Sequence, residues 1–452
     1  MRILFFTWPA RLQRFLDVVS TLAARGNEIV IAAPRDRPGE LPPPLRDLPS
    51  VQLLPYDEVA DAEHGRRRAL LRLARDYAWY LTPPHAENPF NRRRALDFLV
   101  REVSGGKRGA DPKWPDPLPV APARAAAAAA ALAALEEQLP PDSGVLEFMR
   151  EQRPDVVLVT PLVLAGSRQV DVVKAARMLR VPSALLVYSW DNLSNKGLIH
   201  VQPDRVYVWN EVQRREAAEL HGVPYERAIA TGAPRWDAFF ARTPSESREE
   251  FLRSHGLDPG EPLILYLGSS SAVCPDETLV IERWLDAIRR SDGHLRTANV
   301  LVRPHPREAV MWSGWAPDDP RVAMIRQPRQ ADQALYDELF HANGAVGLNT
   351  SAQIEAGIVG TPIFTFAAGS LAPGQAGSLH FRYLLGDEGG SVTFASTLEE
   401  HVEQLERALA GHADAAALRG FVERFVRPRG LDLAASPILA DEIEALAGVR
   451  LR

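Results

Sequence analysis

One segment of the sequence, GLNTSAQIEAGIVGTPIF from Gly347 to Phe364, has the pattern of a strand, a polar turn, a short helix, a Gly-Thr-Pro stop and a second strand. The turn places the hydroxyls of Thr350 and Ser351, with several amide N–H groups, at the start of the helix, where anions bind well. Glu355 follows Ser351 at a spacing that puts both on one helix face. A phosphate at Ser351 would leave Glu355 within reach of a sugar hydroxyl, as binding of a nucleotide diphosphate requires.

The same residues also allow an interpretation without a ligand. Thr350 and Gln353 have the spacing of a capping box, whereas Ser351 and Glu355 are one residue too far apart for one. Pro362 after the helix is ordinary helix-stop chemistry. Taken alone, the segment supports a nucleotide site and a simple helix cap equally.

The composition is that of a globular protein with more than one domain. The 452 residues are too many for one ordinary core, so two domains are expected. Hydrophobic residues make up 46% and charged residues 24% of the chain, which are globular values. The net charge of -6 argues against general nucleic-acid binding. Cys274 is the single cysteine, so no intramolecular disulfide can form, which fits a reducing compartment.

No apolar stretch has the length of a membrane anchor. The N-terminal apolar run is closed by Pro9 and is too short for a secretion signal. The alanine-rich run from Ala125 to Leu135 falls short of the roughly 18–20 residues that a membrane span needs. We therefore expect a cytoplasmic protein, with peripheral membrane contact left open.

Strands and helices alternate along most of the chain, which predicts an α/β protein with two Rossmann-like domains. The first domain is expected at residues 1–243, and a helix at 430–452 is expected to pack back onto it. A helix from Leu12 to Arg25 is predicted to end at Gly26. The predicted strands are Ile3–Thr7, Glu28–Ala32, Val51–Leu54, Asp155–Thr160, Ala184–Tyr188 and Arg205–Trp209.

The alternation stops between about residues 57 and 140, where we expect a helical insertion. An arginine-rich, helix-compatible region runs from Arg66 to Arg94, interleaved with aromatic residues. A linker at 105–122 and an alanine-rich helix at Ala123–Gln138 follow. The arginines indicate either a solvated helix face or a surface that contacts a partner or an anionic membrane.

The second domain is expected at residues 244–429 with its own alternating series. Its predicted strands are Leu263–Leu267, Val300–Val302, Val322–Ile325, Gly344–Leu348, Pro362–Phe366 and Ser391–Phe394.

Two further loops of the second domain follow predicted strands. Ser269, Ser270 and Ser271 come after Gly268 in the first strand-to-helix turn, where doubly wound sheets bind phosphate, although small polar residues are common in any turn. Arg303 and His305 follow the next strand. Prolines on both sides of His305 fix the backbone, so the imidazole is a candidate for binding phosphate or lying near the base, and Arg303 for neutralising charge. The alternative is an ordinary loop histidine.

The loop Ser189–Gly197 is the corresponding candidate in the first domain. Trp190, Asn192 and Lys196 are suited to sugar recognition, and Asp191 is the candidate general base for an acceptor hydroxyl. The alternative is an Asx-type turn. Arg235 is a further candidate for the acceptor site, although Pro234 there also fits a plain helix start.

The two Rossmann-like halves combine with three motifs of the second domain, Gly268-Ser269-Ser270-Ser271, Arg303-Pro304-His305-Pro306 and Thr350-Ser351…Glu355…Gly360-Thr361-Pro362. The set resembles the GT-B glycosyltransferases. The His-Pro pair with a downstream Ser/Thr pair is similar to capsule-type sialyltransferases and CDP-glycerol glycerophosphotransferases, and UDP-N-acetylglucosamine 2-epimerases share the architecture. The chain departs from the pattern after its first strand, where Trp8-Pro9-Ala10-Arg11 replaces a glycine-rich loop.

The resemblance implies a glycosyltransferase that moves a sugar from a nucleotide-sugar donor to an acceptor hydroxyl in an interdomain cleft. Glu355 would take the ribose hydroxyls, and Thr350 and Ser351 the phosphates. A nucleotide-sugar epimerase or hydrolase and a non-catalytic nucleotide-sugar-binding protein are the alternatives. The sequence has no HExxH or CxxC motif and no DxD in the first domain, so we expect no metal and no cofactor.

Overall fold

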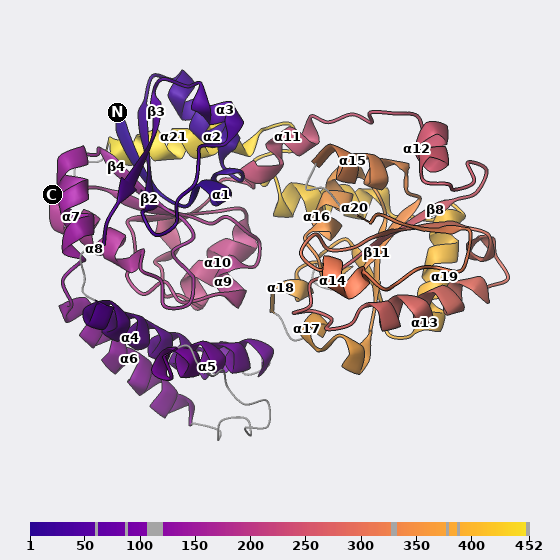
Figure 1. The fold of residues 1–452 in the computed structure, drawn as a ribbon, viewed down its shortest axis with the longest axis horizontal. Helices are drawn as coiled ribbons and strands as arrows, with labels where there is room; N and C mark the ends of the chain where they lie inside the picture. Colours follow the sequence, from indigo (N-terminus) through magenta and orange to yellow (C-terminus); the bar gives the residue numbers. More distant parts are fainter. Residues whose placement is uncertain are drawn as a thin grey trace. The chain divides into compact units, whose positions relative to one another are not determined.

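The computed structural model describes residues 1–58, 62–85, 89–105, 121–326, 332–376, 379–386 and 389–448. They form two compact units (Figure 1). Unit 1 comprises Met1–Asp237 and Phe425–Arg452, and unit 2 comprises Ala238–Arg424. Each unit contains one parallel sheet, which confirms the prediction of an α/β protein with two Rossmann-like domains. Most of the predicted linker, residues 106–120, lies outside the described residues.

The sheet of unit 1 has the strand order β3-β2-β1-β4-β5-β6-β7. The chain moves outward from β1 in one direction and then resumes at β4 on the other side of β1, so the strand order reverses between β1 and β4. The pattern had not predicted the short β7, in which Ile229 between two alanines is the one residue typical of strands. The strands are β1 Arg2–Phe6, β2 Glu28–Pro34, β3 Val51–Tyr56, β4 Val156–Val159, β5 Ser183–Leu186, β6 Arg205–Val208 and β7 Ala228–Ala230.

Both faces of this sheet are buried, because successive side chains of a strand point to opposite sides. In β1, Ile3 and Phe5 pack in one apolar cluster, with α2 and α21. Leu4 and Phe6 pack in a second cluster, with residues of α7 and α8. The continuous apolar runs of the strands follow from this double burial.

The predicted helix from Leu12 to Arg25 is wrong as a single element. The structure has α1 (Pro9–Leu12) and α2 (Leu16–Ala24), because Phe15 leaves the helical conformation with φ -131 and ψ 18. The other helices of unit 1 outside the insertion are α3 Pro43–Arg46, α7 Ser143–Gln152, α8 Val170–Leu179, α9 Asn192–Asn195, α10 Glu211–Glu219 and α21 Ala435–Ala447.

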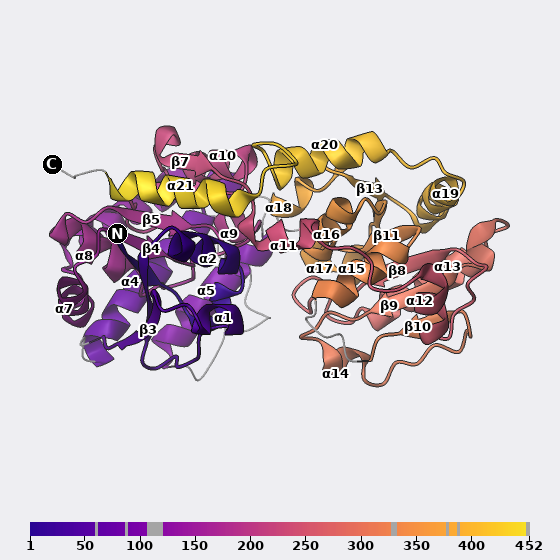
Figure 2. The same cartoon turned by 90° about the horizontal axis from the view of Figure 1, so that it is seen from above.

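The C-terminal helix α21 lies beside α2, as Figure 2 shows with α21 in yellow. Asp237 fixes its start, since its carboxylate accepts the N–H groups of Ala435 at 2.9 Å and Ser436 at 2.7 Å. The same carboxylate accepts a bond from Arg427 at 3.0 Å. A side chain distant in sequence thus caps α21, whose own N-cap residue makes no side-chain capping bond.

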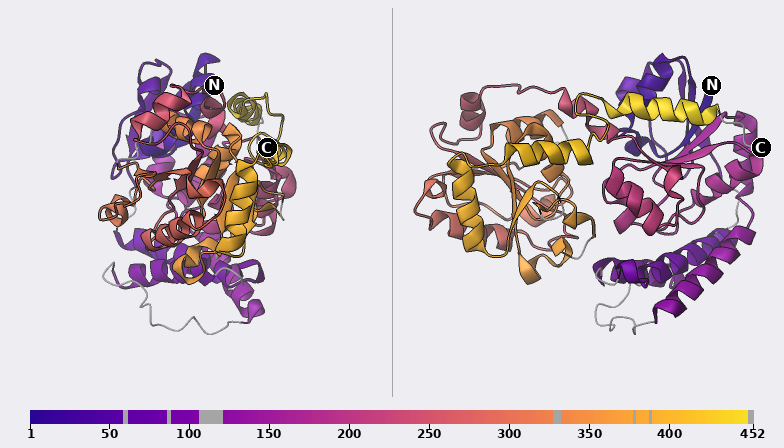
Figure 3. Two further views of the ribbon diagram at one scale, coloured as in Figure 1. Left: turned by 90° about the vertical axis from the view of Figure 1, so that its right-hand side faces the viewer. Right: turned by 180° about the vertical axis from the view of Figure 1, so that it is seen from behind.

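The insertion in unit 1 consists of α4 (Ala62–Tyr80), α5 (Pro89–Val103) and α6 (Pro122–Gln138). These helices lie together along one side of the unit, as Figure 1 and the right panel of Figure 3 both show. Arg72 of α4 is buried and bonds the Glu136 carboxylate of α6 at 3.0 and 3.1 Å. It also pairs with Asp171 of α8 at 2.9 Å, which ties the insertion to the core.

The sheet of unit 2 has the order β10-β9-β8-β11-β12-β13. As in unit 1, the first strand is central, and the order reverses between β8 and β11. One face packs on α13 and α19, in an apolar cluster around Trp284. The strands are β8 Leu263–Leu267, β9 Asn299–Arg303, β10 Val322–Met324, β11 Gly344–Gly347, β12 Ile363–Phe366 and β13 Val392–Ala395.

The helices of unit 2 include α15 and α16, which contact each other and the sheet. α11 (Asp237–Phe240) and α20 (Ala415–Phe425) each cross a boundary between the units in sequence. The helices within unit 2 are α12 Arg248–Ser254, α13 Thr278–Arg289, α14 Ala309–Trp312, α15 Asp332–His341, α16 Ala352–Val359, α17 Pro373–Ala376, α18 Leu379–Arg382 and α19 Leu398–Leu409.

Candidate functional site

Three of the predicted loops meet at the carboxyl edge of the sheet in unit 2. They follow the neighbouring strands β9, β8 and β11, where the strand order reverses. In open α/β sheets this switch point is where ligands bind. Gly268 N donates to Arg303 O at 2.8 Å, and a Cβ at Gly268 would lie 2.9 Å from His305 N. A Cβ at Gly347 would lie 3.2 Å from Leu267 O. Glycine therefore permits the close contact of the three loops.

The serine loop has an inner and an outer part. Ser269 is fully buried, and its N–H donates to Glu277 Oε2 at 2.6 Å. Ser271 is exposed and donates from N and Oγ to Glu308 Oε1, both at 3.0 Å. Ser270 is half-buried between them. Ser269 thus supports the loop from below, and Ser270 and Ser271 lie on its outer side.

Beneath the serine loop, Glu277 is a buried carboxyl group. It also accepts a bond from Tyr266 Oη at 3.1 Å. Burial raises the pKa of Glu277 to about 7, because a charged carboxylate is poorly solvated there. Sequence analysis did not identify Glu277. Its position after the serine loop, at the start of α13, is the feature of the sequence that could have indicated a role in this site.

The two predicted residues of the β9 loop have different environments. Arg303 is buried and its guanidinium pairs with Glu338 of α15, so Arg303 joins the loop to that helix. His305 is half-buried, and burial lowers its pKa, which favours the neutral ring. Its Nδ1 accepts the N–H of Arg307 at 3.3 Å. This bond places the ring proton on Nε2.

The β11 loop leads into α16 with Ser351 as the N-cap residue. The Ser351 side chain makes no capping bond, whereas Gln353 Oε1 accepts the Thr350 N–H at 3.0 Å. Gln353 Nε2 donates to Gly347 O at 3.0 Å, so Gln353 holds the turn from within. Of the two bonds in the predicted capping box, the one from the Thr350 N–H to the Gln353 side chain is therefore present. Glu355 lies one turn further along α16 and is 7% exposed.

In unit 1, the predicted acceptor loop follows β5 at the carboxyl edge of that sheet. Asn192 is fully buried and its Oδ1 accepts the N–H groups of Tyr188 and Ser189, both at 3.1 Å, which precede it in the chain; the arrangement is not an Asx turn, in which the acceptor bonds an N–H two residues further on. Trp190 is buried as well. Asp191 and Lys196 are half-buried, with Lys196 Nζ 2.7 Å from Asp191 Oδ2. Asn192 therefore shapes the loop, and the Asp191–Lys196 pair is its more accessible part.

Sequence analysis missed two arginines beside this loop. The guanidinium groups of Arg11 and Arg14 lie over the ring of Tyr188, at 4.4 and 5.0 Å from its centroid. Arg14 Nη1 also donates to Tyr188 O at 3.0 Å. Burial is the main cause that lowers the pKa of Arg14, and repulsion from the half-buried Arg235 adds to it, so Arg235 lies in the same group. Arg11 and Arg14 both follow the first strand closely, and this placement could have indicated that they lie near a ligand.

The arginines of the insertion mostly bond within unit 1. Arg68 pairs with Asp171 at 2.8 Å, and Arg75 donates to His200 O at 2.7 Å. Arg94 Nη2 bonds Asn195 of the acceptor loop, at its backbone oxygen and, at 3.1 Å, at Oδ1. These contacts orient the insertion against the acceptor loop. Membrane contact through the insertion stays a prediction.

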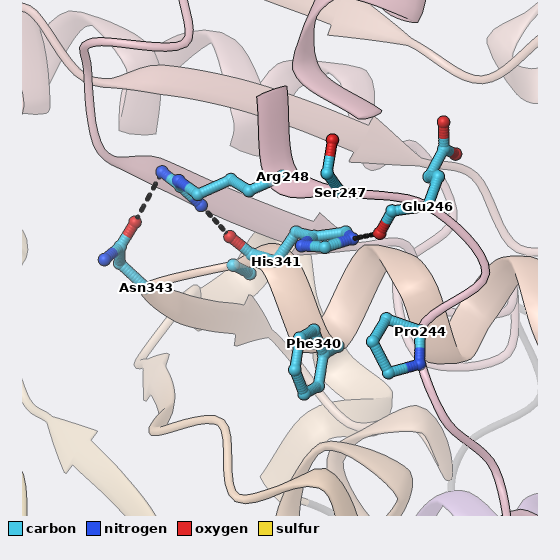
Figure 4. Close-up of a pocket in the computed structure, with 8 residues that line it drawn as sticks. Pro244, Glu246, Ser247, Arg248, Phe340, His341 and Asn343 are labelled. Atoms are coloured by element: carbon cyan, nitrogen blue, oxygen red, sulfur yellow. Dashed lines mark hydrogen bonds between the residues drawn. The ribbon is translucent and has the colours of Figure 1, made fainter. Parts of the chain in front are cut away.

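A hollow of about 410 Å³ lies at the other edge of the sheet in unit 2 (Figure 4). Several of its polar side chains bond within the protein. Arg248 donates to His341 O and, at 3.1 Å, to Asn343 Oδ1. The His341 ring bonds Glu246 O through Nε2 at 3.1 Å. These residues precede β8 or β11, so the hollow is remote from the serine loop.

Two features of the described residues bear on metal binding and on membrane insertion. No group of three or more His, Cys, Asp or Glu side chains among them is arranged to hold a metal ion. None of the helices in the described ranges combines the length and apolar character of a membrane span. Independence of metal and cofactor stays a prediction.

Comparisons with known proteins identify the fold. No family model and no curated protein sequence matches the chain. The UDP-GlcNAc 2-epimerase from Methanocaldococcus jannaschii matches with a TM-score of 0.51 at 12% identity, over 98% of this chain and 99% of the other. The S. aureus MnaA–UDP co-structure matches with a TM-score of 0.52 at 11% identity, over 100% of this chain and 98% of the other. A glycosyltransferase from Rickettsia africae ESF-5 matches with a TM-score of 0.54 at 10% identity, over 99% of this chain and 98% of the other. The chain therefore has the GT-B fold.

Proposed function

We propose that the chain is a nucleotide-sugar-dependent glycosyltransferase. The observation that carries the proposal is the meeting of the Ser269–Ser271, Arg303–His305 and Thr350–Glu355 loops at the switch point of one parallel sheet. Backbone N–H groups, serine and threonine hydroxyls and a neutral imidazole N–H suit the oxygens of a diphosphate. Glu355, one helical turn beyond Ser351, would accept bonds from the ribose hydroxyls.

The acceptor would bind unit 1, at the loop that carries Asp191. The Asp191 carboxylate would take the proton of the acceptor hydroxyl as the hydroxyl oxygen attacks the anomeric carbon. The bond from that carbon to the diphosphate oxygen breaks, and the nucleotide diphosphate leaves. Lys196 and Asn195, both bonded to Asp191 Oδ2, would fix the orientation of the base. The donors around His305 and Ser351 would stabilise the charge on the leaving diphosphate.

Titration with UDP tests the donor site, because one structural match is a complex with UDP. We expect UDP to raise the thermal midpoint of the wild type by mass action. Glu355→Gln should weaken UDP binding by about tenfold or more, since a bond to a charged group contributes about 1.5–3 kcal/mol. Glu399→Gln, at an exposed glutamate of α19, is the matched control and should bind as the wild type does. Equal affinity of Glu355→Gln and wild type would contradict the ribose role.

A nucleotide-sugar epimerase is the second candidate. It is favoured by His305, a neutral imidazole at the donor loops, and by the epimerases among the structural matches. Incubation with UDP-GlcNAc alone separates the two activities. Formation of the C2 epimer without an added acceptor would favour the epimerase, whereas release of UDP only when an acceptor is added would favour the transferase. In either case His305→Gln should reduce turnover more than it reduces UDP affinity.

A further inference from the structure

A cluster of cations lies at the carboxyl edge of the sheet in unit 1. Arg11 and Arg14 come after β1, Tyr188 after β5 and Arg235 after β7. All three strands are parallel, so these residues share the edge at which ligands bind in open α/β sheets. Figure 1 shows α1, which contains Arg11, at the ends of the unit 1 strands.

The aromatic ring of Tyr188 holds the two arginines in place. Arg11 lies over this ring and also over the ring of Trp8, at 5.0 Å. Arg14 lies over the Tyr188 ring and bonds the backbone oxygen of the same residue. A guanidinium group that stacks on an aromatic ring keeps its N–H groups directed along its own plane, where a planar or tetrahedral oxyanion can accept them.

The cations of this cluster repel one another. Burial, with repulsion from Arg235 and Arg11, lowers the pKa of Arg14 to about 10. Tyr188 and, to a smaller extent, Asp191 oppose this lowering. Asp191 also pairs with Lys196. An oxyanion bound beside Arg14 would reduce the repulsion between the guanidinium groups.

We propose that Arg11, Arg14 and Arg235 form a binding site for an oxyanion carried by the acceptor. This inference rests on the proposed function, because it assumes that unit 1 holds the second substrate. The acceptor is then a sugar or a similar polyol that bears a phosphate or a carboxylate group. The oxyanion would lie between the guanidinium groups, with the acceptor hydroxyl directed toward Asp191. Arginine is suited to both anions because its paired N–H groups match two oxygens at once.

Binding of simple probes to the full chain tests the proposal. The probes are glucose 6-phosphate, glucuronate and glucose, each titrated with saturating UDP present and again without it. We expect one or both anionic sugars to bind and glucose to bind at least about tenfold more weakly. The comparison of glucose 6-phosphate with glucuronate identifies which oxyanion is preferred. Titrations with added NaCl should show weaker binding of the anions.

Variants assign the binding to the cluster. Arg11→Gln and Arg14→Gln should each weaken anion binding by about tenfold or more and leave UDP affinity within about twofold of the wild type. Arg215→Gln, at an exposed arginine of α10, is the matched control and should bind both ligands normally. Anion binding that is undiminished in Arg11→Gln and Arg14→Gln, or equal binding of glucose, would overturn the oxyanion site while the donor proposal stands. Failure of the wild type to bind UDP would instead overturn the donor proposal.

Discussion

Glu277 is an ionisable residue that the fold places directly beneath a candidate ligand loop. Its side chain is fully buried and bonds the Ser269 N–H and the Tyr266 hydroxyl. A protonated carboxyl group is less costly to bury than a charged one, which is why burial raises its pKa to about 7. The charge on Glu277 therefore changes near neutral pH, within bonding distance of the serine loop.

We predict that the stability of unit 2 depends on pH through Glu277. The pKa is raised in the folded state, so the stabilisation is fully present below the unfolded pKa and is lost as pH rises through about 7. The shift from 4.5 to about 7 corresponds to roughly 3–4 kcal/mol in the free energy of unfolding. Urea unfolding at about pH 5 and about pH 8.5 measures it.

Glu277→Gln should remove this dependence. The glutamine amide can accept the Ser269 N–H through its oxygen and donate to Tyr266 through its nitrogen, as the protonated acid does. The variant should match the wild type at about pH 5 and exceed its stability at about pH 8.5. Glu282→Gln, at an exposed glutamate of the same helix, should leave the wild-type pH profile unchanged. If the free energy of unfolding of Glu277→Gln changed with pH in parallel with that of the wild type, Glu277 would not be the cause of the pH dependence.

The candidate loops could be predicted from sequence because each follows an apolar strand, and parallel strands bring their carboxyl ends to one edge. Which side chains within a loop face a ligand could not be predicted. Ser269 and Asn192 are turn residues in type, yet both are fully buried and bond the backbone or carboxyl groups beneath them. Arg11 and Arg14 were missed because their position depends on Tyr188, a residue distant in sequence.

At the scale of elements, the insertion is held by buried charges in addition to an apolar cluster of Trp79, Tyr80, Ala95 and Leu198. Arg72 of α4 contacts Glu136 of α6 and Asp171 of α8, and its side chain is 1% exposed. Lys174 Nζ lies 3.1 Å from Glu136 Oε1, and Arg68 pairs with Asp171, so three cations and two carboxylates form one network. The arginine-rich pattern of α4 indicated a solvated face or a docking surface, because sequence alone does not reveal the carboxylates of α6 and α8 that pair with it.

Removing Arg72 should destabilise the insertion strongly. Arg72→Met leaves the buried carboxylates of Glu136 and Asp171 with one cationic partner each, Lys174 and Arg68. Removal of one partner from a buried ion pair costs up to about 3–5 kcal/mol. Hydrogen exchange should increase in α4 and α6, and the free energy of unfolding of unit 1 should fall. Arg67→Met is the matched control, because Arg67 of the same helix is exposed and, among the described residues, pairs with the exposed Glu63. A surface pair of this kind contributes at most about 1 kcal/mol. Equal losses for the two variants would refute a stabilising role for the network.

At the scale of the whole molecule, the chain forms two units with separate apolar cores, and its last helix returns to the first unit. Alternation of strands predicted the two sheets, since each apolar run is a strand buried on both faces. It did not predict what fixes α21. Asp237 begins α11, and its carboxylate also caps α21 and pairs with Arg427. Such contacts join residues far apart in the sequence and leave no local pattern.

Ending the chain at Gly430 should therefore unfold unit 1 and spare unit 2. Leu439, Ile443 and Leu446 pack in the core formed by β1 and α2, and each contributes roughly 1.5–3 kcal/mol. Their sum approaches the whole stability of an ordinary domain, about 5–15 kcal/mol. The described core of unit 2 contains no residue of α21. Limited proteolysis with mass spectrometry should show cleavage throughout unit 1 and protection of unit 2.

Two point variants test the same argument without truncation. Ile443→Ala should lower the free energy of unfolding of unit 1 by about 2–5 kcal/mol, because it removes a fully buried side chain. Leu433→Ala, at a leucine that is 53% exposed and precedes α21, should change it by less than about 0.5 kcal/mol. UDP affinity should stay the same in both, since the donor loops belong to unit 2. Loss of protection in unit 2 after Ile443→Ala would show that the two cores unfold together, against this prediction.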